Sequence, residues 1–289
     1  MLKYALVTIL FLLVVAPRTV IATPEKGPTR ERRTLRANNF KHERDAGDYF
    51  SKFGPTFVNR VLRAGPNHHL LDWGAGNMVF ARQIAGLEPI PSYDHLVGVE
   101  QMRRFSSAAG PNVTGVSYLV SGPKAILPAS KFNPLTGALF RDLPAESITG
   151  RFGSVHTAVD FWGVLGYTSD PSAALSALHR VVDASAQVFV LSGPRNFVRT
   201  SAMSGRRKVF SSLHASTVEL TDGQTLTLPD WISTRLESWT ATVDQTAPRR
   251  DVLLLRPASA KATRRLELLG EPSDHKPPHR RFREVPADL

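Results

Sequence analysis

The chain contains no cysteine among its 289 residues. This absence excludes disulfides, a thiolate nucleophile and every zinc site that depends on cysteine ligands. Three motifs are also missing, namely the HExxH of metalloproteases, the GxSxG of serine hydrolases and the phosphate-binding loop of nucleoside triphosphatases. The sequence therefore supports none of those three enzyme classes, and we expect no bound metal.

The longest apolar run is short for a membrane span. It occupies residues 4–16 after the positive charge of Lys3, and the small residues Val20 and Ala22 follow it at the spacing that signal peptidase accepts. We interpret residues 1–22 as a secretory signal peptide. The alternative is an uncleaved anchor, whose basic flank would hold the body of the protein in the cytosol.

Acidic residues are outnumbered, since 36 Lys and Arg face 25 Asp and Glu and give a net charge of +11. The excess lies at the two ends, over residues 18–44 and 261–283. Basic ends of this kind can contact acidic lipid head groups or nucleic acid, or can simply be solvated. Hydrophobic residues make up 42% of the chain, which is enough for one sizeable folded domain between these ends.

The composition divides the chain after the signal peptide into three regions. Residues 23–45 are polar and basic and are interpreted as a linker. Residues 46–257 form the predicted folded domain. Residues 258–289 carry several prolines among charged residues and are predicted to be a disordered basic tail.

Strand and helix patterns alternate within the predicted domain. Helices are predicted at 46–64 (one or two short ones), 77–86, 101–109 and 171–183. Buried strands are predicted at 69–73, 95–100, 116–121, 154–161 and 187–192. Such alternation predicts a parallel sheet that is covered on both faces.

The end of the domain changes character, because two antiparallel hairpins are predicted there. Residues 216–229 hold Asp222-Gly223 between two alternating runs, which is a turn signal. Residues 238–244 and 250–257 supply the strands of the second hairpin.

A glycine turn follows the first predicted strand, in the order Asp72-x-Gly74-x-Gly76. Glycines let a backbone approach a ligand closely. Glu100 ends the second predicted strand, where an acid can accept both hydroxyls of a ribose. A dinucleotide site would need glycine at Val79, so NAD is disfavoured. The alternative is a tight structural turn whose backbone is capped by Asp72.

The Asp-x-Gly-x-Gly pattern resembles motif I of the class I S-adenosylmethionine-dependent methyltransferases. The resemblance covers residues 46–257 and implies a Rossmann-like α/β fold, with a seven-stranded, mostly parallel sheet and a C-terminal antiparallel hairpin. It implies S-adenosylmethionine as the cofactor and an unknown methyl acceptor. The residues that it assigns to the cofactor are Asp72, Gly74, Gly76, Glu100 and, for the adenine, Asp142 in the segment 139–147.

Three positions depart from that family pattern. Met78 replaces the third glycine of motif I, Gly153 replaces the acid that opens the fourth strand, and residues 183–186 replace a Pro-Gly-Gly turn. These departures leave two hypotheses open, an active methyltransferase and a non-catalytic protein that binds a partner on the same fold.

Methyl transfer needs a base only when the acceptor must lose a proton, since the enzyme otherwise positions two ligands and excludes water. The sequence assigns no catalytic residue. His156, Asp160 and His179 are candidate bases, with a structural role as the alternative for each. Trp162 follows the fourth predicted strand and either lines a substrate pocket or belongs to the core.

A second resemblance lies upstream of the domain, at Arg33-Thr34-Leu35-Arg36, followed by Glu43-Arg44. It is similar to the Arg-x-Leu-Arg element and the acidic Glu-Arg element of oomycete effectors that are translocated into host cells. The likeness implies secretion, delivery to the cytoplasm or nucleus of a plant cell, and interference with host defence through a host protein. Delivery into a second cell would also let an exported protein meet a cytosolic cofactor. Asn112-Val113-Thr114 is a sequon for glycosylation.

Overall fold

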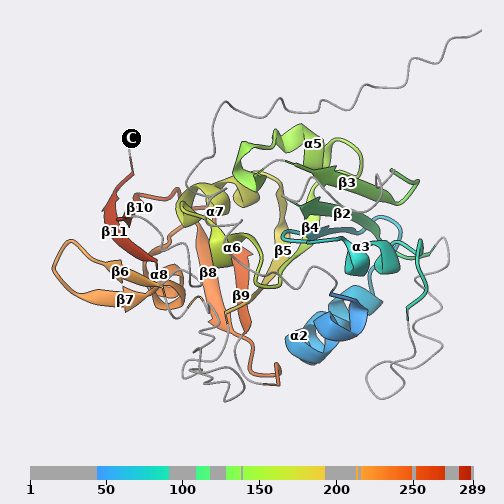
Figure 1. Ribbon diagram of the computed structural model, residues 1–289, viewed down its shortest axis with the longest axis horizontal. Helices are drawn as coiled ribbons and strands as arrows, with labels where there is room; N and C mark the ends of the chain where they lie inside the picture. Colours follow the sequence, from blue (N-terminus) through green and yellow to red (C-terminus); the bar gives the residue numbers. More distant parts are fainter. Residues whose placement is uncertain are drawn as a thin grey trace, which may run out of the picture.

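The computed structural model describes residues 44–90, 109–117, 128–137, 139–192, 213, 216–248, 252–270 and 280–287. Its centre is a seven-stranded sheet with the order β3-β2-β1-β4-β5-β9-β8 (Figure 1). The strands are β1 (His69–Asp72), β2 (Asn112–Ser117), β3 (Phe132–Thr136), β4 (Val155–Asp160), β5 (Val182–Leu191), β8 (Trp239–Val243) and β9 (Val252–Pro257).

The direction of the strands confirms the predicted fold class. All pairings from β3 to β5 are parallel, whereas β9 runs antiparallel to both β5 and β8. The sheet is therefore seven-stranded, mostly parallel and closed by a C-terminal antiparallel hairpin, as a Rossmann-like α/β protein requires. The β8–β9 pair confirms the hairpin that the sequence predicts over residues 238–257.

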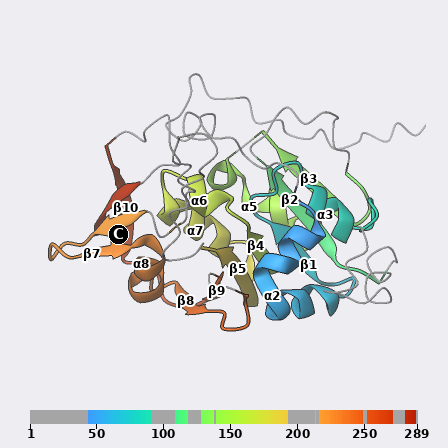
Figure 2. The same cartoon turned by 60° about the horizontal axis from the view of Figure 1, so that its bottom comes forward.

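Both faces of the sheet are covered, which explains why nearly all residues of its inner strands are buried. Helices α2 (Ala46–Leu62) and α3 (Val79–Ile84) cover one face (Figure 2). The other face carries η1 (Phe140–Asp142), α5 (Ala145–Thr149), α6 (Val164–Tyr167) and α7 (Pro171–His179). Strand β1 shows the result most clearly, because all four of its residues are buried.

Helix α2 brings four aromatic side chains to the sheet, and its cap precedes the predicted domain by one residue. Asp45 caps the helix, because its Oδ1 accepts a hydrogen bond from the Asp48 backbone N–H at 2.9 Å. The linker predicted over 23–45 is thus two residues too long, since Arg44 and Asp45 belong to the folded body. A kink at Gly54 divides the helix, in agreement with the prediction of one or two short helices.

Strand β2 differs from the sequence-based prediction. The strand hydrogen-bonded to β1 on this side is Asn112–Ser117, with His69 opposite Asn112 and Asp72 opposite Gly115. The strand predicted at 116–121 overlaps only its end. The predicted strand at 95–100, with Glu100, and most of the helix predicted at 101–109 lie outside the described residues.

Strand β5 begins five residues before the predicted strand at 187–192. Val182 pairs with Val155 and Gln187 with Thr157, so three extra residues enter β5 between these two pairs. A bulge of this kind is local and leaves the sheet intact. Residues 183–186, predicted to replace a turn, therefore lie within a strand, and α7 ends at His179.

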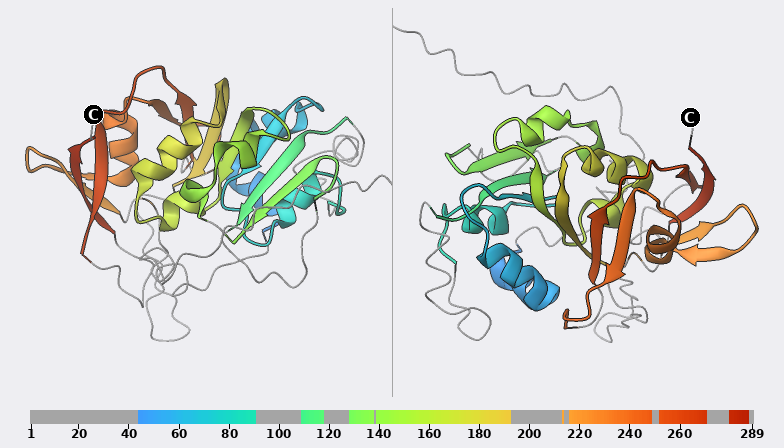
Figure 3. Two further views of the ribbon diagram at one scale, coloured as in Figure 1. Left: turned by 90° about the horizontal axis from the view of Figure 1, so that it is seen from above. Right: turned by 180° about the vertical axis from the view of Figure 1, so that it is seen from behind.

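A second sheet lies beside the first and overturns the prediction of a disordered tail at 258–289 (Figure 3). Its order is β10-β11-β6-β7, with β6 (Thr217–Glu219), β7 (Thr225–Thr227), β10 (Arg264–Leu269) and β11 (Arg281–Pro286). Helix α8 (Leu228–Arg235) packs against it. The β6–β7 hairpin is confirmed, with Gly223 in the left-handed region at φ +83°.

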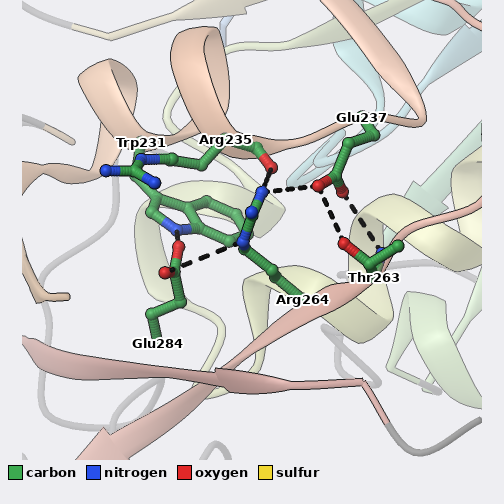
Figure 4. Close-up of polar contacts among 6 residues, drawn as sticks. All are labelled: Trp231, Arg235, Glu237, Thr263, Arg264 and Glu284. Atoms are coloured by element: carbon green, nitrogen blue, oxygen red, sulfur yellow. Dashed lines mark hydrogen bonds and ion pairs between the residues drawn. The ribbon is translucent and has the colours of Figure 1, made fainter. Parts of the chain in front are cut away.

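Charged residues of the tail have hydrogen-bond and ion-pair partners in the folded body. Glu284 is buried and its Oε2 accepts a hydrogen bond from Trp231 Nε1 at 2.7 Å, and Arg264 bridges Glu237 at 2.5 Å (Figure 4). Arg280 is buried as well and donates to the carbonyl of Leu165 at 2.8 Å. Composition alone assigns such charges to solvent, and only the folded partners bury them.

The N-terminal predictions lie outside the described residues. These are the signal peptide at 1–22, the linker up to residue 43 and the motif Arg33-Thr34-Leu35-Arg36. In the part of the chain that is described, no helix has the length and apolar character that a membrane span requires.

Candidate cofactor-binding site

Two buried carboxyl groups end the neighbouring strands β1 and β4. Asp72 is the last residue of β1 and Asp160 the last of β4, and they are 0% and 1% exposed. The chain leaves β1 toward β2 on one side and later returns to place β4 on the other side. Open α/β sheets bind ligands at the carboxyl ends of strands where the order reverses in this way.

Asp72 has one oxygen with a partner and one without. Its Oδ1 accepts a hydrogen bond from the Tyr49 hydroxyl at 3.0 Å, while Oδ2 has no hydrogen-bond partner. Burial raises the pKa of Asp72 to about 7, although the Tyr49 hydrogen bond and the charge of Arg44 lower it. A buried oxygen without a partner costs stability, and such groups concentrate where ligands bind.

Asp160 uses both of its oxygens within the protein. Oδ1 accepts from the Gly163 backbone N–H at 2.5 Å and Oδ2 from that of Leu165 at 2.8 Å. Burial raises the pKa of Asp160 to about 6, against the effect of these two hydrogen bonds. Asp160 therefore holds the start of α6, so the structural alternative describes it better than the role of a base.

The glycine turn packs against the loop that follows β4. A Cβ atom at Gly74 would lie 2.4 Å from the Cα atom of Gly163, so both positions require glycine for two backbones to touch. Gly76 is left-handed at φ +52°. The space beside Gly74 is thus filled by the protein itself, as the tight-turn alternative predicts.

Met78 has a left-handed backbone, the conformation that favours glycine. Its φ of +59° is unfavourable for a residue with a Cβ atom. Its side chain is fully buried and packs against Gly115, where an added Cβ would lie 3.1 Å from the methionine Sδ. Packing of this side chain holds the strained backbone in place.

Arg44 is a site residue that the sequence reasoning missed. Its guanidinium Cζ lies 4.6 Å from the ring centre of Phe161 and 5.7 Å from that of Trp162, and its Nη1 donates to the Phe161 carbonyl. Its carbonyl accepts a hydrogen bond from the Phe80 N–H at 3.2 Å. A helix-cap signal at Asp45 could have moved the domain boundary, but no sequence pattern reveals the aromatic partners.

The other cofactor residues predicted from the sequence are not brought to Asp72. Glu100 lies outside the described residues. Asp142 ends η1, its side chain is 56% exposed, and it forms an ion pair with its neighbour Arg141 at 3.4 Å. Asn112 of the sequon lies at the opposite end of the β1–β2 pair, where its side-chain amide donates to the Pro66 carbonyl at 2.6 Å.

The two candidate histidine bases lie away from the carboxyl ends of the strands. His156 Nδ1 accepts the backbone N–H of His69 at 3.2 Å, at the amino end of β1. His179 Nε2 lies 3.0 Å from the Ala258 carbonyl and its ring packs against Trp239. Both residues have structural partners, which leaves the site without an assigned base.

No known protein family matches the sequence, and a search of curated proteins also finds no match. A search of solved structures matches the chain to a crystal structure of the antibiotic-resistance methyltransferase Kmr. The two are 18% identical, the match covers 71% of this chain and 92% of that one, and the TM-score is 0.35. So distant a likeness carries no argument about the site.

The described residues at the site include groups that attract the positive charges of S-adenosylmethionine. This cofactor carries a sulfonium and an ammonium. The aromatic faces of Phe161 and Trp162, over which Arg44 lies, attract cations, and so does the buried carboxyl group of Asp72. The glycine turn does not leave its backbone open on every side, because Gly163 packs against the Cβ side of Gly74. No group of three potential metal ligands occurs in the described ranges.

Proposed function

We propose that the protein binds S-adenosylmethionine at the carboxyl ends of β1 and β4 and is a methyltransferase. The observation that carries this proposal is Asp72, a wholly buried carboxyl group with a free oxygen, directly before the Gly74–Gly76 turn. It lies where the strand order of the sheet reverses, which is the position at which this class of fold binds ligands.

The chain's own residues would bind and orient the cofactor. Asp72 would accept a hydrogen bond through its free oxygen, while Tyr49 holds the other oxygen in place. Phe161 and Trp162 would face positive charge. Glu100 for the ribose and Asp142 for the adenine remain predictions from the sequence. When bound, S-adenosylmethionine supplies a methyl group on a sulfonium, and the protein would exclude water from it.

Calorimetric titration of the full chain with S-adenosylmethionine tests this proposal. We expect saturable binding of the cofactor, weakened at least tenfold in Asp72→Asn and in Glu100→Ala. Glu146→Gln is the matched control, because Glu146 is an exposed acid on α5. If the folded chain binds no cofactor, and neither does a folded variant in which Arg44 is replaced by alanine, the proposal that the protein is a methyltransferase is wrong.

The second candidate is a non-catalytic protein that binds a host partner on the same fold. The contact between Gly74 and Gly163 favours it, because the first glycine of the motif packs against the protein's own backbone on its Cβ side. Both oxygens of Asp160 also accept hydrogen bonds from backbone N–H groups at the start of α6, so neither is free for a ligand. In this case the chain and all its variants would be folded but would bind no cofactor.

We propose further that the protein is a secreted effector delivered into a host cell, as the sequence of residues 1–22 and 33–36 implies. One described residue bears on this part of the proposal. Arg44, assigned by the sequence to the Glu-Arg element of the leader, packs within the folded body. N-terminal sequencing of the protein secreted by its source cells tests the first step, because cleavage after Ala22 is expected.

The partners of the basic ends stay predictions. Acidic lipid head groups could bind the linker, and nucleic acid could bind either end. The methyl acceptor is unidentified.

A further inference from the structure

The positive charge of Arg44 acts on both buried carboxyl groups of the site. Burial raises the pKa of Asp72 and of Asp160, and the charge of Arg44 opposes that effect at each of them. The guanidinium nevertheless donates its hydrogen bond to a backbone carbonyl, that of Phe161. Arg44 Nε and Asp72 Oδ2 are both buried and both lack a hydrogen-bond partner. The cation and the carboxyl group thus each keep hydrogen-bonding capacity that the protein does not use.

The surroundings of the guanidinium are those of a cation-binding site. Phe161 lies under it at 4.6 Å and Trp162 at 5.7 Å, and a carbonyl oxygen accepts its hydrogen bond. Aromatic faces bind guanidinium, ammonium and sulfonium groups through the same electrostatic attraction. Trp162 has a left-handed backbone, with φ +49°, which directs the loop after β4 in an uncommon way. Its indole Nε1 is buried without a partner.

We propose that Arg44 is an internal cation that fills this site and inhibits the protein, so that a cationic ligand binds only after Arg44 leaves. The inference rests on the proposed function for the identity of that ligand, S-adenosylmethionine. Two positive charges in one low-dielectric site repel each other strongly, so the cofactor and the guanidinium exclude one another. The protein would therefore bind the cofactor weakly until the start of its folded body is displaced.

The position of Arg44 in the chain suits such a displacement. Asp45, the next residue, already caps α2, so the helix keeps its own N-terminal hydrogen bond when Arg44 moves. Two contacts hold Arg44 besides the aromatic rings, its Nη1 on the Phe161 carbonyl and its own carbonyl on the Phe80 N–H. Residues 1–43 lead directly into Arg44, so a partner that binds them can shift it.

A structural role for Arg44 is the competing explanation. In that case the guanidinium only offsets the buried carboxyl groups, and its removal would lower stability without creating a site. Arg44→Ala and Arg44→Gln in the full chain separate the two explanations. The glutamine keeps a side-chain N–H for the Phe161 carbonyl and removes the charge. Arg63→Ala is the control, because Arg63 is an exposed arginine at the other end of α2.

Two ligands test the inference independently of the proposed function. Methylguanidinium should raise the melting temperature of Arg44→Ala, and leave the unmodified chain and Arg63→Ala unchanged. S-adenosylmethionine should bind both Arg44 variants at least tenfold more tightly than the unmodified chain, and methylguanidinium should compete with it. Stabilisation by methylguanidinium without cofactor binding would uphold the cation site and reject the methyltransferase. Folded variants that bind neither ligand better than the unmodified chain would overturn the inference.

Trypsin digestion of the unmodified chain gives a readout that needs no substitution. A ligand that displaces Arg44 should accelerate cleavage of the bond after this residue. Slower cleavage in the presence of a saturating cationic ligand would show that Arg44 stays bound, and would contradict the inference.

Discussion

The two ends of the β1–β4 pair differ in how completely their buried polar groups are hydrogen-bonded. At the amino end, His69 is fully buried with Nδ1 at 2.8 Å from the Gly153 carbonyl and Nε2 at 2.8 Å from Thr114 Oγ1. At the carboxyl end, Asp72 Oδ2 and Trp162 Nε1 are buried without partners. Complete pairing stabilises a fold, whereas unpaired buried groups are kept where a ligand can bind them.

The charges at the two ends also respond oppositely to pH. Burial lowers the pKa of His68 and of His69 to about 4, so these rings are neutral in the folded protein. Burial raises the pKa of Asp72 to about 7 and of Asp160 to about 6. Burial therefore disfavours the charged form of the side chains at both ends. At the amino end a low pH destabilises the fold, because the histidines become charged, and at the carboxyl end a high pH does so, because the aspartates become charged. The comparison separates a structural end of the sheet from a functional one, and three experiments test it.

The largest effect is expected at the amino end, from His69→Leu. The substitution leaves the buried Thr114 hydroxyl and the Gly153 carbonyl without their partner, which should cost about 2–4 kcal/mol of the free energy of unfolding. Denaturant unfolding measures it, with Asp72→Asn as the matched change at the carboxyl end. The asparagine can still accept from Tyr49 and removes a buried charge, so a gain of about 1 kcal/mol at pH 8 is expected. Equal losses in both variants would remove the contrast between the ends.

A smaller effect divides the carboxyl end itself. Asp160→Asn replaces one of two accepting oxygens by an NH₂ group that faces a backbone N–H, either that of Gly163 or that of Leu165. We expect a loss of about 1–3 kcal/mol in unfolding at pH 8, opposite in sign to Asp72→Asn. Opposite signs for the two variants would show that, of the two carboxyl groups, only Asp72 has an oxygen that is free to bind a ligand. A stabilised Asp160→Asn would place both carboxyl groups in the same class.

The smallest effect is on the pH dependence of stability. The lowered pKa of His68 and His69 makes the unfolded chain bind more protons below pH 6.5, so their contribution is lost as the pH falls toward 4. The raised pKa of Asp72 acts oppositely, because its contribution is present below pH 3.8 and is lost as the pH rises through about 7. These effects oppose each other between pH 4 and 6.5.

Asp72→Asn should therefore steepen the loss of stability on acidification, by up to about 1.4 kcal/mol per pH unit. Unfolding free energies measured at half-unit steps from pH 4 to 7 give the slope, and Glu146→Gln serves as the exposed control. An unchanged slope in Asp72→Asn would mean that this carboxyl group titrates alike in the folded and unfolded chain.

Local patterns in the sequence predicted much of the sheet. The apolar segments of β1 and β4 and the turn at Asp222-Gly223 were each found from a few adjacent residues. The turn joins residues that are close in the chain, and each of the two strands is recognised by its own run of buried apolar residues. The fold class followed, because alternating strands and helices permit few arrangements.

The strands of the tail and the neighbour of β1 could not be found in this way. Glu284 and Arg280 are charged residues buried in or beside β11, and their alternation with exposed arginines shows no apolar period. Segment 95–100 is the more apolar candidate for the strand beside β1, yet Asn112–Ser117 takes that position. Competition between segments for one sheet edge depends on the whole fold and has no local signature.

By itself, the sequence determined the Asp72-x-Gly74-x-Gly76 turn and its place at the end of a buried strand. Only the tertiary structure decided what surrounds that turn. Gly163 is 89 positions from Gly74 in the chain and Phe161 is 117 from Arg44, yet each pair is in contact. The sheet brings the end of β4 beside the end of β1, and Tyr49 near the start of α2 contacts Asp72 and Phe161. The free oxygen of Asp72 and the packing of Arg44 on Phe161 are products of that convergence, which is why no local pattern could reveal them.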